Sequence, residues 1–467
     1  MKLVWFRNDL RTGDHSALYA ACKNNAGEGV LAVAAITPFQ WFLQDESKSR
    51  VQFWLANLQS LCQQLSKLNI PLKIIAVERN AELPEAFLKL AREHRVRELY
   101  FNLEYPEYEQ RRDSRVTALL QKQGVRCHSF ESDLILPPGS VLNQKGDAYR
   151  VFTPFSRAWK KHYLQQLPSP LPVPPVQPVT SITSDKVPKQ INYANTVGAD
   201  WNIDLWPTGE DAARSQLLNF VAEKFGGYKE QRDLPGIAGT SVLSPYFSVG
   251  VLSARQCLAA IQSYSDDPEW FDNQWVTEVI WREFYRHLLV LFPELNRWQP
   301  FKPEIEEKIP WQNNSELFAA WCQGETGFAI VDAGMKQLLT TGWMHNRVRM
   351  VTASFLTKLL REDWRAGAEY FMRHLIDGDF ASNLGGWQWS ASVGADAAPY
   401  FRIFNPMRQA ERFDAAGDYV SYWLPELKGL TAVQQHDPLF SVARGRPAPL
   451  IDYRQARASS IEAFHQS

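Results

Sequence analysis

One short stretch near the end of the chain combines side chains that rarely occur together. Residues 377–391 read DGDFASNLGGWQWSA, so two acids and two tryptophans lie within a few turns of the chain. A packed core disfavours the carboxylates, and an exposed loop disfavours the indoles. Both demands are met if the stretch wraps a large, flat and partly polar group, since aromatic rings are the surfaces on which bases and planar cofactors stack.

A second candidate is WVTEVIWREFYRHLL (275–289), whose apolar residues have helical spacing. On a helix, Glu278, Trp281, Arg282 and Tyr285 share one face, because residues three, four and seven apart project the same way. That face offers a carboxylate, an indole and a guanidinium together. It is also compatible with a buried helix held by a Glu278–Arg282 ion pair, so the pattern alone leaves both interpretations open.

Two further stretches carry notable polar groups. GTSVLSPYFSVGVLS (239–253) predicts a helix start at Ser244-Pro245, where hydroxyls and free N–H groups could bind a phosphate or simply cap the helix. GWMHNRVRM (342–350) mixes an amide, two cations and a thioether, and its His345 is expected to be structural. Ser/His/Asp, Cys/His and metal-ligand spacings do not occur, so neither hydrolysis nor a metal centre is expected.

Alternating apolar runs and helical patterns predict a doubly wound, Rossmann-like parallel sheet at the N-terminus. The expected strands are 3–6, 30–36, 72–77 and 98–105, and the expected helices are 50–68, 82–95 and 107–123. The usual glycine-rich nucleotide loops are missing. Residues 168–188 are proline-rich and predict an extended connector, and the pattern is helical from about residue 206. We therefore expect an α/β domain (1–130), a linker (131–205) and an all-α domain (206–467).

The composition is that of a globular enzyme. Net charge is −1, but seven Lys or Arg against three acids between residues 336 and 373 make a basic segment, which suits either a DNA-binding face or a solvated helix. Five cysteines lie far apart without a CxxC pair, which argues against disulfides and zinc and for a reducing compartment. Neither a signal peptide nor a membrane span is evident, so a cytoplasmic location is expected.

Several of these stretches together resemble the photolyase/cryptochrome family. The matching motifs are GTSVLSPYFSVGVLS (239–253), WREFYRHLL (281–289), TGWMHNRVRM (341–350) and DGDFASNLGGWQW (377–389), and LVWFRNDLR (3–11) and FTPFSRAW (152–159) fit the same family. The resemblance covers nearly the whole chain and is closest to the bacterial class I photolyases that act on cyclobutane pyrimidine dimers. It implies FAD in the helical domain, an antenna pigment near the α/β domain and light-dependent DNA repair.

By this resemblance, one group of residues surrounds the flavin. Asp377 and Asp379 are expected to hydrogen-bond its ribose and ring donors, with Arg349 neutralising Asp377. Asn383 matches the residue beside flavin N5, where an amide tolerates changes in flavin charge. The matching shell as a whole comprises Tyr228, Thr240, Ser241, Val242 (through its backbone), Leu243, Ser244, Trp275, Arg282, Asn346, Arg349, Asp377, Gly378, Asp379 and Asn383.

A second group matches residues that act on DNA and on electrons. In the family, reduced and photoexcited FAD gives an electron to a dimer that has left the duplex, the cyclobutane ring splits, and the electron returns. The dimer site is matched by two flat walls, a polar anchor and an apolar neighbour, namely Trp281, Trp389, Glu278 and Met350. The remaining DNA contacts are matched by Arg232, Asn346, Arg347 and Arg408. The tryptophan chain that photoreduces FAD is matched by Trp387, Trp364 and Trp311.

Relatives with other functions define the alternatives. A signalling cryptochrome, which binds FAD and a partner protein, remains the alternative. A (6-4) photolyase is disfavoured because Asn346 and Met350 replace its histidines, and a DASH-type cryptochrome because Trp389 stands where it has tyrosine.

The antenna and the partners follow from the same resemblance. Glu109 matches the anchor of a folate antenna, which favours 5,10-methenyltetrahydrofolate over a deazaflavin, although it could equally be a plain exposed acid. Three nearby positions depart from the folate pattern, namely Tyr108, Asn296 and Arg297. We expect a monomer that binds DNA containing pyrimidine dimers.

Overall fold

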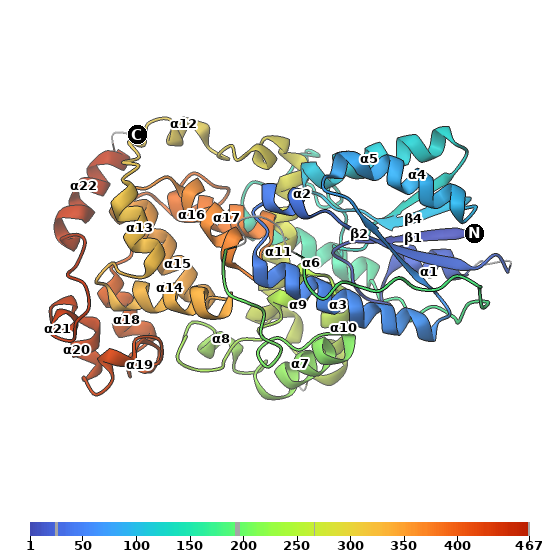
Figure 1. Cartoon of the computed structure of the whole chain (residues 1–467). Coiled ribbons are helices and arrows are strands. Elements are labelled where there is room, and N and C mark those ends of the chain that lie inside the picture. Colours follow the sequence, from blue (N-terminus) through green and yellow to red (C-terminus); the bar gives the residue numbers. More distant parts are fainter. Residues whose placement is uncertain (24–26, 192–196, 266, 466–467) are drawn as a thin grey trace.

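The computed structural model describes every residue except 24–26, 192–196, 266 and 466–467. Its N-terminal part is an α/β domain at one end of the molecule (Figure 1). Among the described residues, a five-stranded sheet has the order β3-β2-β1-β4-β5, and every pairing is parallel. The strands are β1 (Lys2–Phe6), β2 (Val30–Ile36), β3 (Leu72–Ala76), β4 (Glu98–Asn102) and β5 (Arg126–Phe130). The helices are α1 (Ser16–Lys23), α2 (Pro38–Leu43), α3 (Lys48–Lys67), α4 (Leu83–Glu93) and α5 (Glu107–Lys122).

This strand order is that of a doubly wound sheet, so the predicted fold class is confirmed. The four expected strands are present, but the fourth ends at Asn102 rather than at residue 105. Residues 103–105 instead lead toward α5, and Glu104 in this connection pairs with Arg112 of α5 at 2.6 Å. The strand β5 is additional. Its sequence, RCHSF, has no apolar run because the strand lies at the sheet edge and is only partly buried.

The proline-rich stretch 168–188 forms neither helix nor strand, as its composition predicts. It lies beside the edge strand β3. The Asp185 backbone N–H donates to the Leu72 carbonyl at 2.8 Å, and the Ile74 N–H donates to the Asp185 carboxylate at 2.9 Å. The connector therefore covers polar backbone groups that an open sheet edge would present to another chain.

Part of the segment predicted as a linker, 131–205, packs with the helical half. It contains α6 (Phe152–Gln166), which lies along α11 (Gln274–Leu291). Glu283 of α11 fastens this segment through its buried carboxylate. That carboxylate accepts hydrogen bonds from the backbone N–H groups of Ile135 and Leu136 and from the indole of Trp159. Burial raises the pKa of Glu283 to about 7 against the effect of these bonds.

The C-terminal half is helical, as predicted from about residue 206, and forms the other end of the molecule (Figure 1). Its main helices are α7 (Glu210–Glu223), α8 (Tyr228–Gln231), α9 (Ser244–Ser248), α10 (Ala254–Tyr264), α13 (Ser315–Gln323), α14 (Ala329–Thr341), α15 (Asn346–Ser354), α16 (Trp364–His374), α17 (Phe380–Ala391), α18 (Pro406–Phe413) and α22 (Tyr453–His465). The helix α15 continues into a π-helical turn, Phe355–Leu360, a feature frequent at functional sites. In the part of the chain that the structure describes, no helix has the length and apolar content to cross a bilayer.

Candidate functional site

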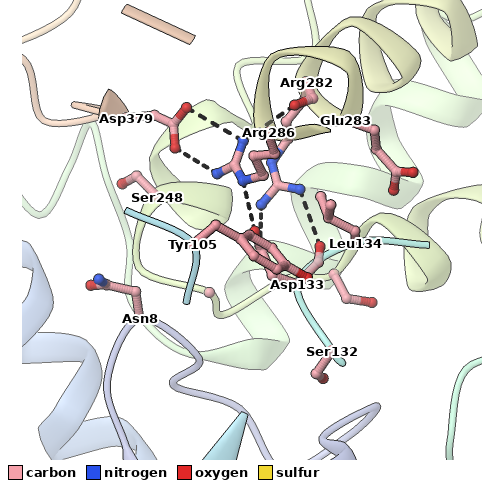
Figure 2. Close-up of polar contacts among 12 residues, drawn as sticks. Asn8, Tyr105, Ser132, Asp133, Leu134, Ser248, Arg282, Glu283, Arg286 and Asp379 are labelled. Atoms are coloured by element: carbon pink, nitrogen blue, oxygen red, sulfur yellow. Dashed lines mark hydrogen bonds and ion pairs between the residues drawn. The ribbon is translucent and has the colours of Figure 1, made fainter. Parts of the chain in front are cut away.

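The body of the DGDFASNLGGWQWSA stretch is α17. Asp379 is its N-cap and accepts a hydrogen bond from a backbone N–H of the first turn at 2.8 Å. The other oxygen of Asp379 pairs with Arg286 at 2.5 Å, and Arg286 also contacts Asp133 at 2.7 Å (Figure 2). One guanidinium thus bridges α17 and the linker. Burial would raise the pKa of Asp379, but Arg286 and Arg282 lower it below its usual value.

Asp377 lies just before α17 and forms the predicted ion pair with Arg349 of α15. The Arg349 guanidinium donates to both carboxylate oxygens, at 2.8 and 3.0 Å, and the Asp377 side chain is only 3% exposed. Arg349 also donates to the Met344 carbonyl at 2.8 Å. The amide of Asn383 donates to the Ala368 carbonyl at 2.9 Å, which holds it in one orientation. These contacts fix the start of α17 against α15 and α16.

The GTSVLSPYFSVGVLS stretch forms a strained loop followed by α9, which begins at Ser244 as predicted. Val242 has a φ of 52°, a left-handed conformation that is costly for a β-branched residue and typical of functional sites. Two indoles hold the loop. Trp275 donates to the Ser241 hydroxyl at 3.0 Å, and Trp343 donates to the Ser244 hydroxyl at 3.3 Å. The loop is therefore held in shape by a side chain of α11 and by one from the connection between α14 and α15.

The remaining members of the predicted flavin shell adjoin these elements. Tyr228 is buried at the start of α8, with the Arg232 guanidinium 5.7 Å from its ring centre. Thr240 and Leu243 lie in the strained loop, and Gly378 separates the two aspartates and lines the cavity between the domains.

Glu278, Trp281, Arg282 and Tyr285 lie on α11 as predicted, but Glu278 and Arg282 each pair with another residue. Glu278 accepts hydrogen bonds from Arg232 and, at 2.9 Å, from the Gln274 amide. Arg282 instead pairs with Asp133 of the linker, so the Glu278–Arg282 ion pair is not formed. Burial would raise the pKa of Asp133, yet the arginines of α11 hold it well below its usual range. The carboxylate of Glu278 therefore stays on the partly exposed side of the helix.

Two partly exposed tryptophans lie on helices that pack together. Trp281 of α11 stacks on Phe152, with ring centroids 3.7 Å apart and planes inclined by 5°. Trp389 lies on α17, which packs against α11. On α15, which also contacts α17, the Asn346 amide lies 4.0 Å from the Met350 sulfur. The predicted walls and the apolar neighbour of the dimer site thus come from adjoining helices.

The arginines predicted to hold DNA phosphates have protein partners. Arg347 pairs with Asp233 at 2.7 Å and lies 4.3 Å from the ring centre of Phe413. Arg408 is exposed and pairs with Glu411 at 2.7 Å. The Arg408–Glu411 pair is exposed, and surface ion pairs contribute little, so a phosphate can compete with Glu411 for Arg408.

His345 has the structural role expected from the sequence. Its ring accepts a hydrogen bond from the Arg347 backbone N–H at 3.2 Å and so caps α15. Burial lowers the pKa of His345 to about 4, which keeps the ring neutral near pH 7. This residue therefore offers no proton donor for acid chemistry.

The three tryptophans predicted for electron transfer differ in their surroundings. Trp387 packs so closely on Gly367 of α16 that a Cβ there would lie 2.3 Å from its ring. Trp364 stands one turn earlier on the same helix, is fully buried, and donates its indole N–H to Glu306 at 3.1 Å. Trp311 is partly exposed, and its indole nitrogen has no hydrogen-bond partner among the described residues. Trp387 thus packs on α16, the helix that begins at Trp364.

A cavity separates the α/β domain from the helical domain, and Glu109 points into it from the first turn of α5. One of its oxygens accepts from Gln44 at 2.8 Å, while the other is buried without a hydrogen-bond partner in the described part of the chain. Burial raises the pKa of Glu109 to about 7. Glu109 is therefore no plain exposed acid. Asp379 and Arg286 line the same cavity.

Tyr108, Asn296 and Arg297, which depart from the folate pattern, lie near the cavity or at the domain boundary. Tyr108 is 58% exposed at the cavity rim. The Asn296 side chain accepts from the Glu107 backbone N–H at 2.9 Å, and Arg297 pairs with the Glu107 carboxylate at 3.2 Å. These two residues bridge the domains beside the cavity.

Three residues of this site were not predicted from the sequence. Arg286 and Asp133 bridge α11, α17 and the linker, and Glu306 binds the indole of Trp364 (Figure 2 for the first two). Arg286 could have been found, since it lies four residues after Arg282 on the same helical face. Asp133 lies in an irregular segment, and Glu306 ends a helix of only four residues, α12 (Pro303–Glu306), so no local periodicity marks either residue.

Two family models match the chain. The model for DNA photolyase matches residues 2–175, and that for the FAD binding domain of DNA photolyase matches residues 275–466. The deoxyribodipyrimidine photo-lyases of Salmonella typhimurium and Escherichia coli are 42% and 41% identical to the chain, each over 99% of this chain and 98% of the relative. The chain belongs to the DNA photolyase family. The match to the family's FAD binding domain begins within α11, so the helical half binds FAD.

Solved structures of the family have the same overall fold. A bacterial class III photolyase from Agrobacterium tumefaciens superposes with a TM-score of 0.86 at 32% identity, over 99% of this chain and 97% of that one. A cryptochrome from Synechocystis superposes with a TM-score of 0.82 at 26% identity, over 99% of both chains. Photolyases and cryptochromes therefore share this fold, and the site residues must distinguish them.

Proposed function

We propose that the chain repairs cyclobutane pyrimidine dimers in DNA by light-driven electron transfer. One observation carries the proposal: Glu278, Trp281 and Trp389 are all retained, partly exposed, on two helices that pack together. The deoxyribodipyrimidine photo-lyase of Salmonella typhimurium, at 42% identity over 99% of this chain, supports the same substrate. When bound and reduced, FAD supplies the photoexcited electron that splits the dimer.

The residues of the helical half fit FAD. The buried Asp377–Arg349 pair and the Asp379–Arg286 pair present carboxylates that can accept hydrogen bonds from ribose hydroxyls and a ring N–H. The strained loop at Val242 presents backbone N–H groups to phosphates. The amide of Asn383, oriented by its hydrogen bond to the Ala368 carbonyl, would lie beside the flavin ring. The cofactor shell proposed is therefore that given by the family resemblance.

The dimer would leave the duplex and enter between Trp281 and Trp389. Two adjacent pyrimidines joined by a cyclobutane ring stack and pair poorly, so their extrusion costs less than that of intact bases. The indoles supply stacking surfaces, and the Glu278 carboxylate can accept hydrogen bonds from base N–H groups. Arg232, Arg347 and Arg408, with Asn346, would meet the phosphates around the opening. These side chains position the dimer and exclude water while the electron moves.

Glu278→Ala tests this assignment. We expect the repair yield per absorbed photon to fall about tenfold, since a charge-assisted hydrogen bond is worth about 1.5–3 kcal/mol, while bound FAD is unchanged. Loss of the carboxylate also leaves Arg232 with Asp233, at 3.7 Å, in place of its closer partner, so affinity for undamaged DNA should hold or rise. Repair of a dimer-containing oligonucleotide, FAD absorbance and DNA affinity are measured on the same preparation. Glu230→Ala, an exposed glutamate on α8, is the control. Loss of FAD from Glu278→Ala would instead make Glu278 a structural residue.

We further propose that the interdomain cavity binds 5,10-methenyltetrahydrofolate as the antenna. The observation behind this is the buried oxygen of Glu109 that has no hydrogen-bond partner among the described residues. It can accept from the amide-like N–H groups of a pterin ring. A solved archaeal photolyase from Sulfolobus tokodaii, 28% identical with a TM-score of 0.81 over 100% of both chains, holds two FAD molecules. A second flavin is therefore the competing occupant.

Glu109→Ala should weaken folate binding about tenfold, because the buried acceptor is lost. Folate binding to the wild type should also weaken as pH falls below about 7, since protonation removes the ionised acceptor. Titration of the folate absorbance against protein at several pH values measures both effects. Glu85→Ala, an exposed acid in the first turn of α4, is the matched control. Folate binding that is unchanged in Glu109→Ala, or tighter binding of a second FAD, would contradict the assignment.

The cellular setting follows from the substrate. The proposed partner is dimer-containing DNA, which in a bacterium lies in the cytoplasm, so we place the chain there. We propose a monomer, because the opening for the dimer must stay accessible to a DNA duplex.

A further inference from the structure

Trp364 lies in a charged environment that favours positive charge on its ring. Its indole N–H donates to the Glu306 carboxylate at 3.1 Å. Arg365 lies 4.6 Å from the ring centre, but it is paired with both Glu306 and Asp363. Two carboxylates against one guanidinium leave the cluster with a net negative charge. An electron vacancy on this buried indole, that is, a tryptophan radical cation, is therefore stabilised electrostatically.

A second indole, Trp298, lies against Trp364. The ring centroids are 6.2 Å apart and the planes are inclined by 35°, which places the ring edges close to contact. The backbone of Trp298 has a φ of 59°, and its carbonyl accepts from Arg365 at 2.9 Å. The left-handed conformation is costly for a residue with a side chain, so the surrounding contacts must hold Trp298 in place.

Trp298 also reaches solvent, which Trp364 does not. It is partly exposed and lines the interdomain cavity, where its ring meets Phe380 edge-on at 5.3 Å. Trp321 provides the contrast. It lies 6.0 Å from Trp387, but it is fully buried and its N–H is bound to a backbone carbonyl. An electron vacancy on Trp321 would have to pass through another side chain, such as Tyr370 at 5.5 Å, whereas one on Trp298 can be discharged directly to the cavity.

We propose that the tryptophan chain branches at Trp364, with one arm leading to Trp311 and a second arm through Trp298 to the interdomain cavity. This inference rests on the proposed Trp387–Trp364 chain. When bound, FAD would supply the photoexcited oxidant. Trp387 would give up one electron to it, and Trp364 would refill the vacancy on Trp387. Trp298 then gives one electron to Trp364 and loses its indole proton to water. A small thiol returns one electron and one proton to Trp298, so that the step balances.

The test is FAD photoreduction by a thiol in single and double variants of the full chain. We expect Trp311→Phe and Trp298→Phe each to be about twofold slower than wild type, and the double variant to be more than about tenfold slower. Trp270→Phe, a partly exposed indole away from the chain, should match wild type. Repair by chemically reduced protein and the FAD content should be unchanged in every variant, which shows that each has folded.

A chemical readout tests the outlet itself. In wild type illuminated in air without thiol, peptide mass spectrometry should find oxidised products at Trp298 but not at Trp321. The branch is overturned if Trp311→Phe alone is as slow as the double variant, or if Trp298 stays unoxidised. If Trp364→Phe photoreduces at the wild-type rate, the chain on which the branch rests is wrong, and the branch fails with it. If repair itself is absent from reduced wild type, the proposed function fails independently of these outcomes.

Discussion

Replacing Trp364 by phenylalanine should slow light-driven reduction of bound FAD by more than about tenfold, equivalent to about 1.4 kcal/mol of added barrier. Phenylalanine is much harder to oxidise than tryptophan, and Trp364 is the indole predicted to follow Trp387 in the chain. It stands at the start of α16, the helix on which Trp387 packs. It also carries the Glu306 contact that stabilises positive charge. Both proposed outlets, Trp311 and Trp298, lie beyond it. The measurement is the bleaching of oxidised FAD under blue light with a thiol present.

Two comparisons make the Trp364 result specific. Repair by Trp364→Phe should equal that of wild type once the flavin has been reduced chemically, because the chain serves only reduction. Glu306→Gln keeps a hydrogen-bond acceptor but removes the charge, so it should slow photoreduction less than Trp364→Phe. Loss of repair in chemically reduced Trp364→Phe, with FAD still bound, would mean that this indole serves the dimer reaction itself.

Asp377→Ala should cost the chain most of its FAD. The substitution removes a carboxylate that is 3% exposed and leaves the Arg349 guanidinium, 24% exposed, without its counter-charge. Breaking a buried ion pair costs about 3–5 kcal/mol, and part of this loss should appear as a lower melting temperature. FAD absorbance relative to protein and thermal unfolding are the measurements. Asp204→Ala, an exposed aspartate in the linker, is the control.

A double variant separates the two roles of Asp377. In Asp377→Ala with Arg349→Gln, the acceptor of Asp377 and the charge of Arg349 are both gone, so thermal stability should recover relative to Asp377→Ala alone. FAD should remain weakly bound if Asp377 accepts hydrogen bonds from the cofactor. Full recovery of FAD binding in the double variant would show that Asp377 acts only by neutralising Arg349.

The sequence predicted those parts of the fold that local patterns determine. Apolar runs located β1 to β4, because strands buried on both faces are continuously hydrophobic. They missed β5, whose edge position allows the polar sequence RCHSF. They also missed that α6 packs along α11, since packing between distant segments leaves no local periodicity.

The same limit applies to the site. The Asp377–Arg349 pair was predicted from the family motifs and the need to neutralise a buried acid, and it is present. The intrahelical Glu278–Arg282 pair considered from spacing is not formed, because Asp133, far away in the sequence, binds Arg282 instead. Nor could spacing reveal Trp298 beside Trp364, since the two lie on different segments and meet only through the tertiary fold.

One measurement tests dimer repair most directly. The purified chain, with FAD bound and reduced, is mixed with an oligonucleotide that carries one thymine dimer and is illuminated with blue light without oxygen, beside a dark control. Restored thymines are then measured by chromatography. We predict restoration in the light and none in the dark. The absence of restoration in the light, with reduced FAD bound, would contradict the proposed repair and favour a signalling cryptochrome that acts through a protein partner.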